Sequence, residues 1–234
     1  MSDLNLAAPR ALLFDLDGTL VDTAPDLVGT LYEMLGEMGV EPPAFAVCRN
    51  RVSQGARGLL ELALGVTVDA KEYAALRSQF LDIYALRICR ESQLFPGVAQ
   101  MLKNLSEQHI AWGVATNKPT RFTKPLLAEL DLLPPSGIVV TPDEVEQGKP
   151  HPAMIELAVE QFEVAAAECW FVGDARQDVT AGRGAGVVTA IAGWGYIEAD
   201  EPTHEWQADL HFDDVAELAK VANSWSGSDS PEEL

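Results

Sequence analysis

The sequence predicts an α/β protein: a doubly wound parallel-sheet (Rossmann-like) core with an inserted all-helical cap domain. Apolar runs at 11–14, 110–115 and 169–173 show no polar alternation, which indicates strands covered on both faces. Between the first two runs, apolar residues recur at helical spacing, and no strand pattern is present from Asp22 to Arg90. We therefore predict a core from 1–21 and 91–223 and a helical cap from 22–90.

The chain is strongly acidic: its 234 residues include 36 Asp and Glu against 16 Lys and Arg, which gives a formal net charge of −20. This charge disfavours binding to nucleic acid or to an anionic membrane, so a small molecule is the expected partner. The start of the chain lacks a signal-peptide pattern, and no apolar run approaches the roughly 18 residues of a spanning helix. We expect a cytoplasmic protein, either a monomer or a weak homodimer.

The cysteines and the helix signals complete the outline. Cys48, Cys89 and Cys169 are widely spaced, which predicts reduced thiols rather than a disulfide or a metal site. In the cap, a helix is expected after Asp22 or Thr23, with further helices at 58–64 and after Asp69. Outside the cap, the pattern predicts helices at 98–105, 120–130 and 180–186, short strands at 137–140, 187–191 and 208–212, a loop at 141–143, and a disordered tail at 224–234.

Two carboxylates follow the first predicted strand, in the sequence Asp15-Leu16-Asp17-Gly18-Thr19. Asp is common in turns, and Gly18 supplies a backbone conformation that other residues resist. A turn alone explains one Asp, but it does not explain a buried strand followed by this whole pattern. Ligands bind beyond the carboxyl ends of parallel strands, so we interpret Asp15 and Asp17 as functional.

Polar groups also follow the second predicted strand and a later loop. Thr116 and Asn117 offer a hydroxyl and backbone N–H groups that can donate to phosphoryl oxygens, although a lone threonine would be a cap or strand residue. Lys149 lies in Gly148-Lys149-Pro150-His151-Pro152, where prolines hold the backbone after it in a defined path. On its own, such a lysine would be a solvated surface charge.

The third buried run leads into Gly173-Asp174-Ala175-Arg176-Gln177-Asp178. Two carboxylates four positions apart, at a strand end and at a helix start, can serve one hard cation and its water shell. The alternative for Asp178 is a simple charge at a helix N-terminus.

A local positive segment interrupts the acidic chain within the predicted cap. Arg49, Arg51 and Arg57 lie in a stretch between Pro43 and Glu61 that contains no acidic residue. Arginine suits bidentate recognition of carboxylate or phosphate, and backbone amides near Gly55 can approach a ligand. Arg49 and Arg51 could equally pair with acids elsewhere on the surface, whereas we expect Arg57 to contact substrate.

Taken in order, these motifs resemble the four motifs of the haloacid dehalogenase superfamily of phosphatases and phosphotransferases. The resemblance covers nearly the whole chain and implies an active site between core and cap. It implies that Asp15 is the nucleophile and forms an aspartyl-phosphate, that Asp17 is the general acid and base, and that Thr116 and Lys149 bind and neutralise the phosphoryl group.

The resemblance also implies a Mg²⁺ ion. The Asp15 and Asp174 carboxylates and the Asp17 backbone carbonyl would hold it, and Asp178 would support it through water. Substrate would contact Asn117 and the cap residues Ser53, Gly55 and Arg57.

Asp17 favours phosphate-ester chemistry over dehalogenation, because a halide leaves without a proton. A phosphonate-cleaving relative would need an imine-forming lysine in the cap, where Lys71 is the only lysine and falls on a polar helix face. Within the phosphoglycolate phosphatase-like branch, Ser53-Gln54-Gly55-Ala56-Arg57 and Thr116-Asn117-Lys118-Pro119 look most like members that act on N-acetylmuramic acid 6-phosphate in cell-wall recycling. The other substrate considered, 2-phosphoglycolate, also carries a carboxylate.

Two further functions stay open at this point. A sugar-phosphate mutase would use the same motifs, and a non-catalytic phospho-acceptor module would hold phosphate on Asp15 as a signal. The intact Asp17 argues against the second, because it would speed loss of the acyl phosphate. The triplet Trp194-Gly195-Tyr196 has no assigned role, and either lining the site or packing would explain it.

Overall fold

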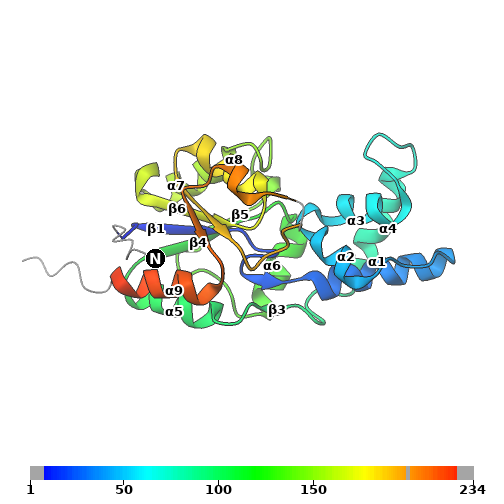
Figure 1. Ribbon diagram of the computed structural model, residues 1–234, viewed down its shortest axis with the longest axis horizontal. Helices are drawn as coiled ribbons and strands as arrows, with labels where there is room; N and C mark the ends of the chain where they lie inside the picture. Colours follow the sequence, from blue (N-terminus) through cyan, green and yellow to red (C-terminus); the bar gives the residue numbers. More distant parts are fainter. Residues whose placement is uncertain (1–7, 199–200, 226–234) are drawn as a thin grey trace, which may run out of the picture.

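The computed structural model describes residues 8–198 and 201–225, and its centre is a six-stranded parallel sheet (Figure 1). The strand order is β5-β4-β1-β6-β7-β8, so the chain starts in the middle and winds outward in both directions. The strands are β1 (Ala11–Phe14), β4 (Ala111–Ala115), β5 (Val139–Val140), β6 (Cys169–Gly173), β7 (Val188–Ala192) and β8 (Leu210–Phe212). The predicted doubly wound core is confirmed.

Helices cover both faces of this sheet, and the side-chain alternation of β1 shows which helices pack on which face. Leu12 and Phe14 belong to one core cluster together with α5, α6 and α9, whereas Ala11 and Leu13 belong to a second cluster with α7 and α8. Figure 1 shows α7 and α8 on one side of the strands and α5 and α9 on the other. These helices are α5 (Val98–Glu107), α6 (Thr120–Glu129), α7 (Ala153–Phe162), α8 (Arg176–Ala185) and α9 (Val215–Ser224).

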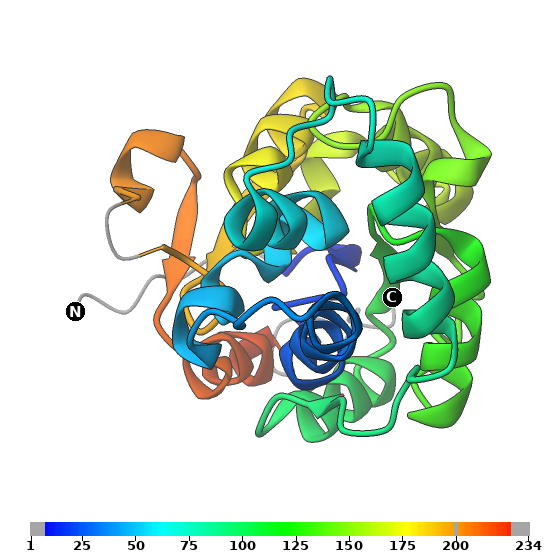
Figure 2. The same ribbon diagram turned by 90° about the vertical axis from the view of Figure 1, so that its right-hand side faces the viewer.

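A helical unit lies at one end of the sheet, in front of it in Figure 2. It consists of α1 (Ala24–Met38), α2 (Phe45–Asn50), α3 (Gly55–Leu64) and α4 (Tyr73–Ala85). Buried apolar residues such as Leu31 and Phe80 form its interior. A short antiparallel ribbon, β2 (Val21–Asp22) with β3 (Gln93–Leu94), carries the chain into this unit and back. We call β2 and β3 the hinge ribbon.

Several element boundaries differ from the sequence prediction. In the helical unit, α2 is an unpredicted helix, α3 begins at Gly55 rather than at residue 58, and α4 begins at Tyr73. The hinge ribbon has only two residues in each strand, too few for an alternating pattern to be visible. The predicted loop at 141–143 is a 3₁₀ turn, Pro142–Glu144, in which the Glu144 carboxylate accepts from the Thr141 backbone N–H and hydroxyl, each at 3.1 Å. Further 3₁₀ turns are Val52–Gln54, Ala166–Glu168 and Thr203–Trp206.

The predicted tail at 224–234 begins too early. Helix α9 continues to Ser224, and the Trp225 ring packs edge-on against Trp170 with 5.1 Å between ring centroids. Ser224 therefore belongs to α9 of the core domain. Trp225 belongs to the same domain, because its buried ring packs against Trp170. The remaining residues of the predicted tail, 226–234, lie outside the described residues.

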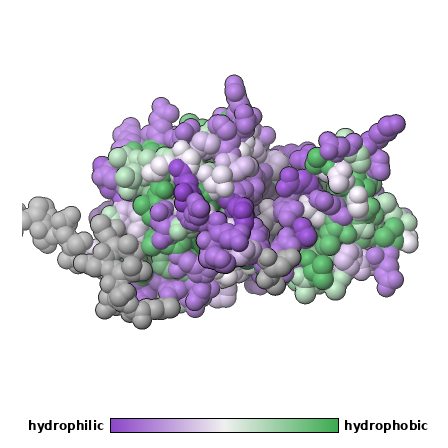
Figure 3. All heavy atoms as spheres, turned by 45° about the horizontal axis from the view of Figure 1, so that its top comes forward, coloured by the Kyte–Doolittle hydropathy of each residue, from purple (hydrophilic) through white to green (hydrophobic). Residues whose placement is uncertain are grey.

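Much of the surface seen in Figure 3 is polar, as expected for a chain with this many charged residues, and the cysteines are free thiols. Figure 3 shows polar side chains over much of the face that it views, with apolar side chains gathered at the end formed by the helical unit and in a second area on the core. Cys48 and Cys169 are buried and Cys89 is half-buried, and all three are free thiols. Burial raises the pKa of the Cys169 thiol to about 12. Among the described residues, every helix is too short or too polar to cross a membrane.

Candidate active site

The functional residues predicted from sequence follow four strands of the sheet. Asp15 comes directly after β1, Thr116 directly after β4, and Asp174 directly after β6, while Lys149 follows β5 after a loop. In a parallel sheet the carboxyl ends of all strands lie at one edge, so the topology brings these side chains together.

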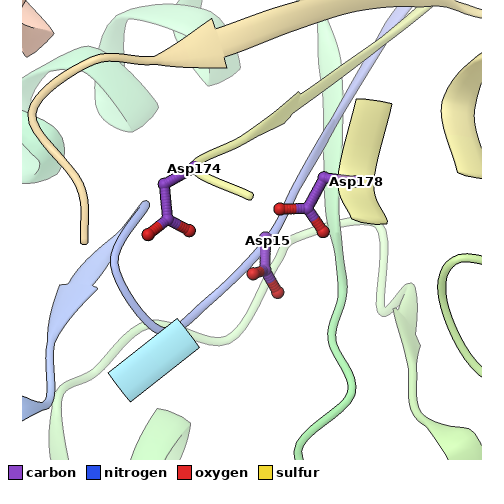
Figure 4. A group of neighbouring side chains, drawn as sticks. All are labelled: Asp15, Asp174 and Asp178. Carbon is purple, nitrogen blue, oxygen red and sulfur yellow. The ribbon is translucent and has the colours of Figure 1, made fainter. Parts of the chain in front are cut away.

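Three carboxylates meet at this edge, those of Asp15, Asp174 and Asp178. All three side chains are buried, and one oxygen of each lies within 4.8 Å of the others. Figure 4 shows Asp15 between the other two, with the carboxylates directed toward a common space. We call these three residues the acidic cluster. Hard oxygen donors in this arrangement are the ligand set that Mg²⁺ prefers.

The buried Lys149 ammonium pairs with two members of the cluster. Its Nζ lies 2.8 Å from Asp15 Oδ1 and 2.7 Å from Asp178 Oδ1, and it donates to the Ala115 carbonyl at 3.0 Å. Asn117 fixes the Lys149 backbone on both sides: its amide donates to the Lys149 carbonyl, and its carbonyl accepts from the Lys149 N–H, each at 2.9 Å. Asn117 therefore holds the lysine in place rather than only lining the site.

One ammonium does not balance three buried carboxylates. Burial raises the pKa of Asp15 to about 7, with the charges of Asp178 and Asp17 acting in the same direction and Lys149 opposing them. Burial, together with the Asp15 and Asp178 charges, raises the pKa of Asp174 to about 8. Lys149 has a pKa above its usual value, because attraction to Asp15 and Asp178 exceeds the opposing effect of burial. The cluster therefore favours additional positive charge.

Asp178 has a partner for each of its oxygens. Oδ1 faces Lys149 at 2.7 Å, and Oδ2 accepts from the Ala175 N–H at 2.9 Å at the start of α8. The contact with the Ala175 N–H fits the helix-terminus interpretation of Asp178, and its support of a metal stays a prediction.

The partners of the Asp17 carboxylate lie outside the acidic cluster. Its Oδ1 accepts from Lys118 Nζ at 2.9 Å and from the Thr23 hydroxyl at 2.6 Å. Gly18, with a φ of 90°, makes the turn after it, and a Cβ there would lie 2.2 Å from Asp174 Oδ2. Only glycine therefore fits between the two carboxylates.

A cavity of about 370 Å³ lies between the sheet edge and the helical unit. Eight of the predicted site residues line it: Asp15, Asp17, Ser53, Gly55, Arg57, Thr116, Asn117 and Lys149. Its apolar wall includes Phe80, Leu81 and Phe122. Residues of the first three motifs thus line one cavity, and the fourth-motif residues Asp174 and Asp178 lie behind it, next to Asp15 in the acidic cluster.

The helical unit contacts the core directly beside the acidic cluster. The Ser53 hydroxyl donates to Asp174 Oδ2 at 2.9 Å, and Gln177 Nε2 donates to the Ser53 carbonyl at 3.4 Å. Arg51 lies 3.3 Å from Glu198, which also accepts from Gln54 Nε2 at 3.3 Å. Ser53, predicted as a substrate contact, therefore also contacts the acidic cluster.

The arginines of the positive segment divide into two kinds. Arg49 pairs with Asp22 at 3.2 Å and Arg51 pairs with Glu198, so both follow the surface-pairing interpretation. Arg57 is exposed, lines the cavity and forms no ion pair within residues 8–198 and 201–225. Arg77, on α4, has the same properties. Within the part of the chain that the structure describes, the cavity wall therefore carries two guanidinium groups without an ion pair, and we call these arginines unpaired.

Sequence reasoning missed Arg77 and Gln177, left Tyr196 without an assigned role, and gave Lys118 no contact of its own. Arg77 lies in a polar stretch of a helix predicted only for its apolar stripe, and Gln177 is an ordinary residue between Asp174 and Asp178. Lys118 follows Thr116 and Asn117 directly. A charged residue next to a strand end that is predicted to be functional could therefore have indicated that Lys118 contacts the site.

The fold and site together define an α/β protein with a cavity and a buried cluster of carboxylates at the carboxyl edge of a doubly wound sheet. The chain belongs to the haloacid dehalogenase-like hydrolases, whose family model matches residues 12–192. The resemblance seen in the motifs is thereby confirmed.

Individual relatives are similar over nearly their whole length. A Pseudomonas putida protein named N-acetylmuramic acid 6-phosphate phosphatase is 38% identical over 215 residues, which cover 92% of this chain and 96% of that one. A Xanthomonas campestris protein named phosphoglycolate phosphatase is 38% identical over 214 residues, with 92% and 96% covered. The crystal structure of a predicted phosphoglycolate phosphatase from Haemophilus somnus has a TM-score of 0.78 at 27% identity, covering 91% of this chain and 97% of that one. The chain is accordingly a phosphatase, a phosphoric monoester hydrolase.

Proposed function

We propose that this phosphatase is Mg²⁺-dependent, forms an aspartyl-phosphate on Asp15, and hydrolyses a phosphate ester that carries a carboxylate, with N-acetylmuramic acid 6-phosphate as the best candidate. One observation carries the proposal. Asp15 of the acidic cluster and Lys149 line the same cavity as Arg57 and Arg77, which form no ion pair among the described residues, so the cavity can hold a phosphoryl group and a second anion.

The residues present fit a divalent cation. Three buried carboxylates share one lysine, and the raised pKa values of Asp15 and Asp174 show that the excess negative charge is costly there. We assign the carboxylates of Asp15 and Asp174 and the backbone carbonyl of Asp17 as ligands, with Asp178 acting through water. Bound Mg²⁺ would screen the charge of the phosphoryl group from the carboxylate that attacks it.

In the first chemical step, an Asp15 carboxylate oxygen forms a bond to phosphorus as the bond from phosphorus to the ester oxygen breaks. Asp17, in its protonated form, gives its proton to the leaving alkoxide. Lys149 neutralises negative charge beside Asp15. Thr116 Oγ1 accepts from the Lys118 N–H at 3.2 Å, which leaves the Thr116 hydroxyl proton free to donate to a phosphoryl oxygen.

In the second step, water attacks the phosphorus of the aspartyl-phosphate and Asp17 takes the water's proton. The bond from phosphorus to Asp15 breaks, which releases phosphate and restores the carboxylate. Lys118 and Thr23 hold Asp17 in one orientation for both transfers.

The cavity favours a sugar phosphate over a two-carbon ester. A space of about 370 Å³ with an apolar wall is suited to a ring with substituents, and phosphoglycolate would leave much of it unfilled. Arg57 and Arg77 would bind the carboxylate, because guanidinium groups pair with carboxylates through two parallel hydrogen bonds. The Pseudomonas relative's name supports this choice, whereas the Xanthomonas relative's name keeps 2-phosphoglycolate as the second candidate.

The test is phosphate release with Mg²⁺ from N-acetylmuramic acid 6-phosphate, N-acetylglucosamine 6-phosphate, 2-phosphoglycolate, glucose 6-phosphate and β-glucose 1-phosphate. The first two compounds differ by a lactyl group that bears the carboxylate. We expect a kcat/KM for the first that exceeds the second by at least about tenfold, the value of one well-placed charged hydrogen bond. Preference for phosphoglycolate would select the second candidate. Conversion of β-glucose 1-phosphate to glucose 6-phosphate without phosphate release would indicate a mutase, and phosphorylation of Asp15 without turnover would indicate a phospho-acceptor.

We place this activity in the cytoplasm, in cell-wall recycling, with the chain acting as a monomer or weak homodimer. The three free thiols are compatible with a reducing compartment. Fractionation of the source cells and sedimentation of the purified chain test the two parts of this assignment.

A further inference from the structure

The segment after β7, Trp194-Gly195-Tyr196, crosses directly over one member of the acidic cluster. A Cβ added at Gly195 would lie 2.1 Å from the Asp174 Cβ, so a larger residue cannot occupy this position without displacing the segment. The close approach of the backbone to Asp174 explains the glycine. It also places the two aromatic residues on either side of Gly195 beside the site.

Each of these aromatic residues contributes to the position of Asp174. The Tyr196 backbone N–H donates to Asp174 Oδ2 at 2.8 Å. The Trp194 indole donates to the Thr19 carbonyl at 2.9 Å, and the Thr19 hydroxyl donates to Asp174 Oδ1 at 3.3 Å. The orientation of the Asp174 carboxylate thus depends on this segment through both oxygens.

The buried Tyr196 side chain extends in the other direction, to the hinge ribbon. Its hydroxyl donates to Asp22 Oδ1 at 2.7 Å and accepts from the backbone N–H groups of Thr23 at 2.7 Å and Ala24 at 3.0 Å. One donor and two acceptor positions are all that a phenol has, so every one is used. The hydroxyl therefore fixes the chain where β2 ends and α1 begins.

The Tyr196 ring also touches the return path of the chain. It packs against Phe95, the residue after β3, with 6.4 Å between ring centroids. The Arg49 guanidinium lies 4.7 Å from the ring centroid and 3.2 Å from Asp22 Oδ2. Both connections between the core and the helical unit therefore meet at this one side chain.

We propose that Tyr196 is a positioning residue that joins the orientation of Asp174 to the hinge ribbon. Its backbone holds the carboxylate, and its hydroxyl anchors that backbone to Asp22 and to the first turn of α1. The proposal rests on the proposed function, in which Asp174 binds a divalent cation. Partners that orient metal ligands typically contribute a factor of about 10–100 to metal affinity.

The experiment measures the affinity of the full-length chain for Mn²⁺ by electron paramagnetic resonance, without substrate. Tyr196→Phe keeps the ring and the backbone N–H and removes only the hydroxyl. We expect its Mn²⁺ affinity to fall about tenfold. The matched control is Tyr32→Phe, which removes a hydroxyl that donates to the Pro43 carbonyl at 2.7 Å, remote from the acidic cluster. It should lose less thermal stability than Tyr196→Phe, because the Tyr32 hydroxyl makes one of these bonds and the Tyr196 hydroxyl makes three, and it should keep its Mn²⁺ affinity.

Unchanged Mn²⁺ affinity in Tyr196→Phe, or an equal fall in both variants, would overturn the inference. If Tyr196→Phe does not fold, Asp22→Ala removes the partner of the same hydroxyl and should lower the affinity in the same direction, with no change again counting against the inference. Asp174→Asn distinguishes a failure of the proposed metal site from a failure of the proposed role of Tyr196. If it binds Mn²⁺ as tightly as the unmodified chain, the metal site itself is wrong. If it loses binding while Tyr196→Phe keeps it, only the positioning role is wrong.

Discussion

Asp15 combines burial, a neighbouring ammonium and a place in the cavity lining, which are the conditions for a carboxylate nucleophile. Asp15→Asn retains the shape of the side chain but removes its nucleophilic charge. We expect phosphate release to fall at least about 10³-fold, as for other nucleophile replacements. The melting temperature should not fall, because one of three crowded buried charges is removed. Substantial remaining turnover in a well-folded variant would contradict the assignment of Asp15.

Asp17 is held by Lys118 and Thr23 outside the acidic cluster, which suits a group that exchanges a proton with the leaving group. Asp17→Asn should lower kcat/KM for an alkyl phosphate, which reports the steps up to release of the alcohol, about 10²–10⁴-fold, the usual contribution of a general acid. The loss should be much smaller for p-nitrophenyl phosphate, whose leaving group departs without a proton. Equal losses on both esters, measured with saturating Mg²⁺, would show that Asp17 acts on the metal site instead.

At the scale of elements, α3 and α4 each present one unpaired arginine to the cavity, Arg57 and Arg77. Removing either guanidinium should raise KM for the carboxylate-bearing sugar phosphate about tenfold or more, since a charged hydrogen bond contributes about 1.5–3 kcal/mol. Hydrolysis of p-nitrophenyl phosphate should be unaffected.

Arg90→Ala is the matched control for Arg57→Ala and Arg77→Ala, because Arg90 is an exposed arginine that does not line the cavity. Its kinetics should equal those of the unmodified chain on both substrates. Loss of activity toward the generic ester in Arg57→Ala or Arg77→Ala would assign these arginines to the phosphoryl site rather than to the carboxylate.

The elements also show which features were predictable from sequence. Buried parallel strands produce long apolar runs, and function lies at their carboxyl ends, so Asp15, Thr116 and Asp174 could be located without a structure. The hinge ribbon could not, because a two-residue strand has no periodicity. The role of Tyr196 depends on contacts with Asp22 and Asp174 at sequence separations of 174 and 22, which no local pattern encodes.

Over the whole molecule, the uneven distribution of negative charge affects the free energy of unfolding. The net charge of −20 is spread mainly over the surface, but the acidic cluster concentrates three carboxylates in the interior. When no cation is bound, these three carboxylates repel one another in the folded chain. Within the described residues, Lys149 is the only ammonium that pairs with them. The protein should therefore be more stable with Mg²⁺ than without it, to a degree that depends on pH.

The direction of that pH dependence follows from the raised pKa values. Asp15 and Asp174, with pKa values of about 7 and about 8, keep protons in the folded state that the unfolded chain releases near pH 4. Where the folded state binds more protons, the free energy of unfolding falls as pH rises, here from about pH 4 to about pH 8. Lys149 is fully charged throughout this range and adds no slope.

The measurement is the melting temperature of the EDTA-treated chain from pH 5.5 to 8.5, with and without Mg²⁺. A tenfold excess of Mg²⁺ over its dissociation constant should raise the melting temperature by about 3–6 °C at pH 8. The rise should be smaller at pH 5.5, where protons compete for the same carboxylates. Asp174→Asn should show a shallower pH slope than the unmodified chain and little response to Mg²⁺, which isolates the acidic cluster from the other carboxylates. A Mg²⁺ effect that is equal at both pH values would mean that the cation binds elsewhere on this acidic chain.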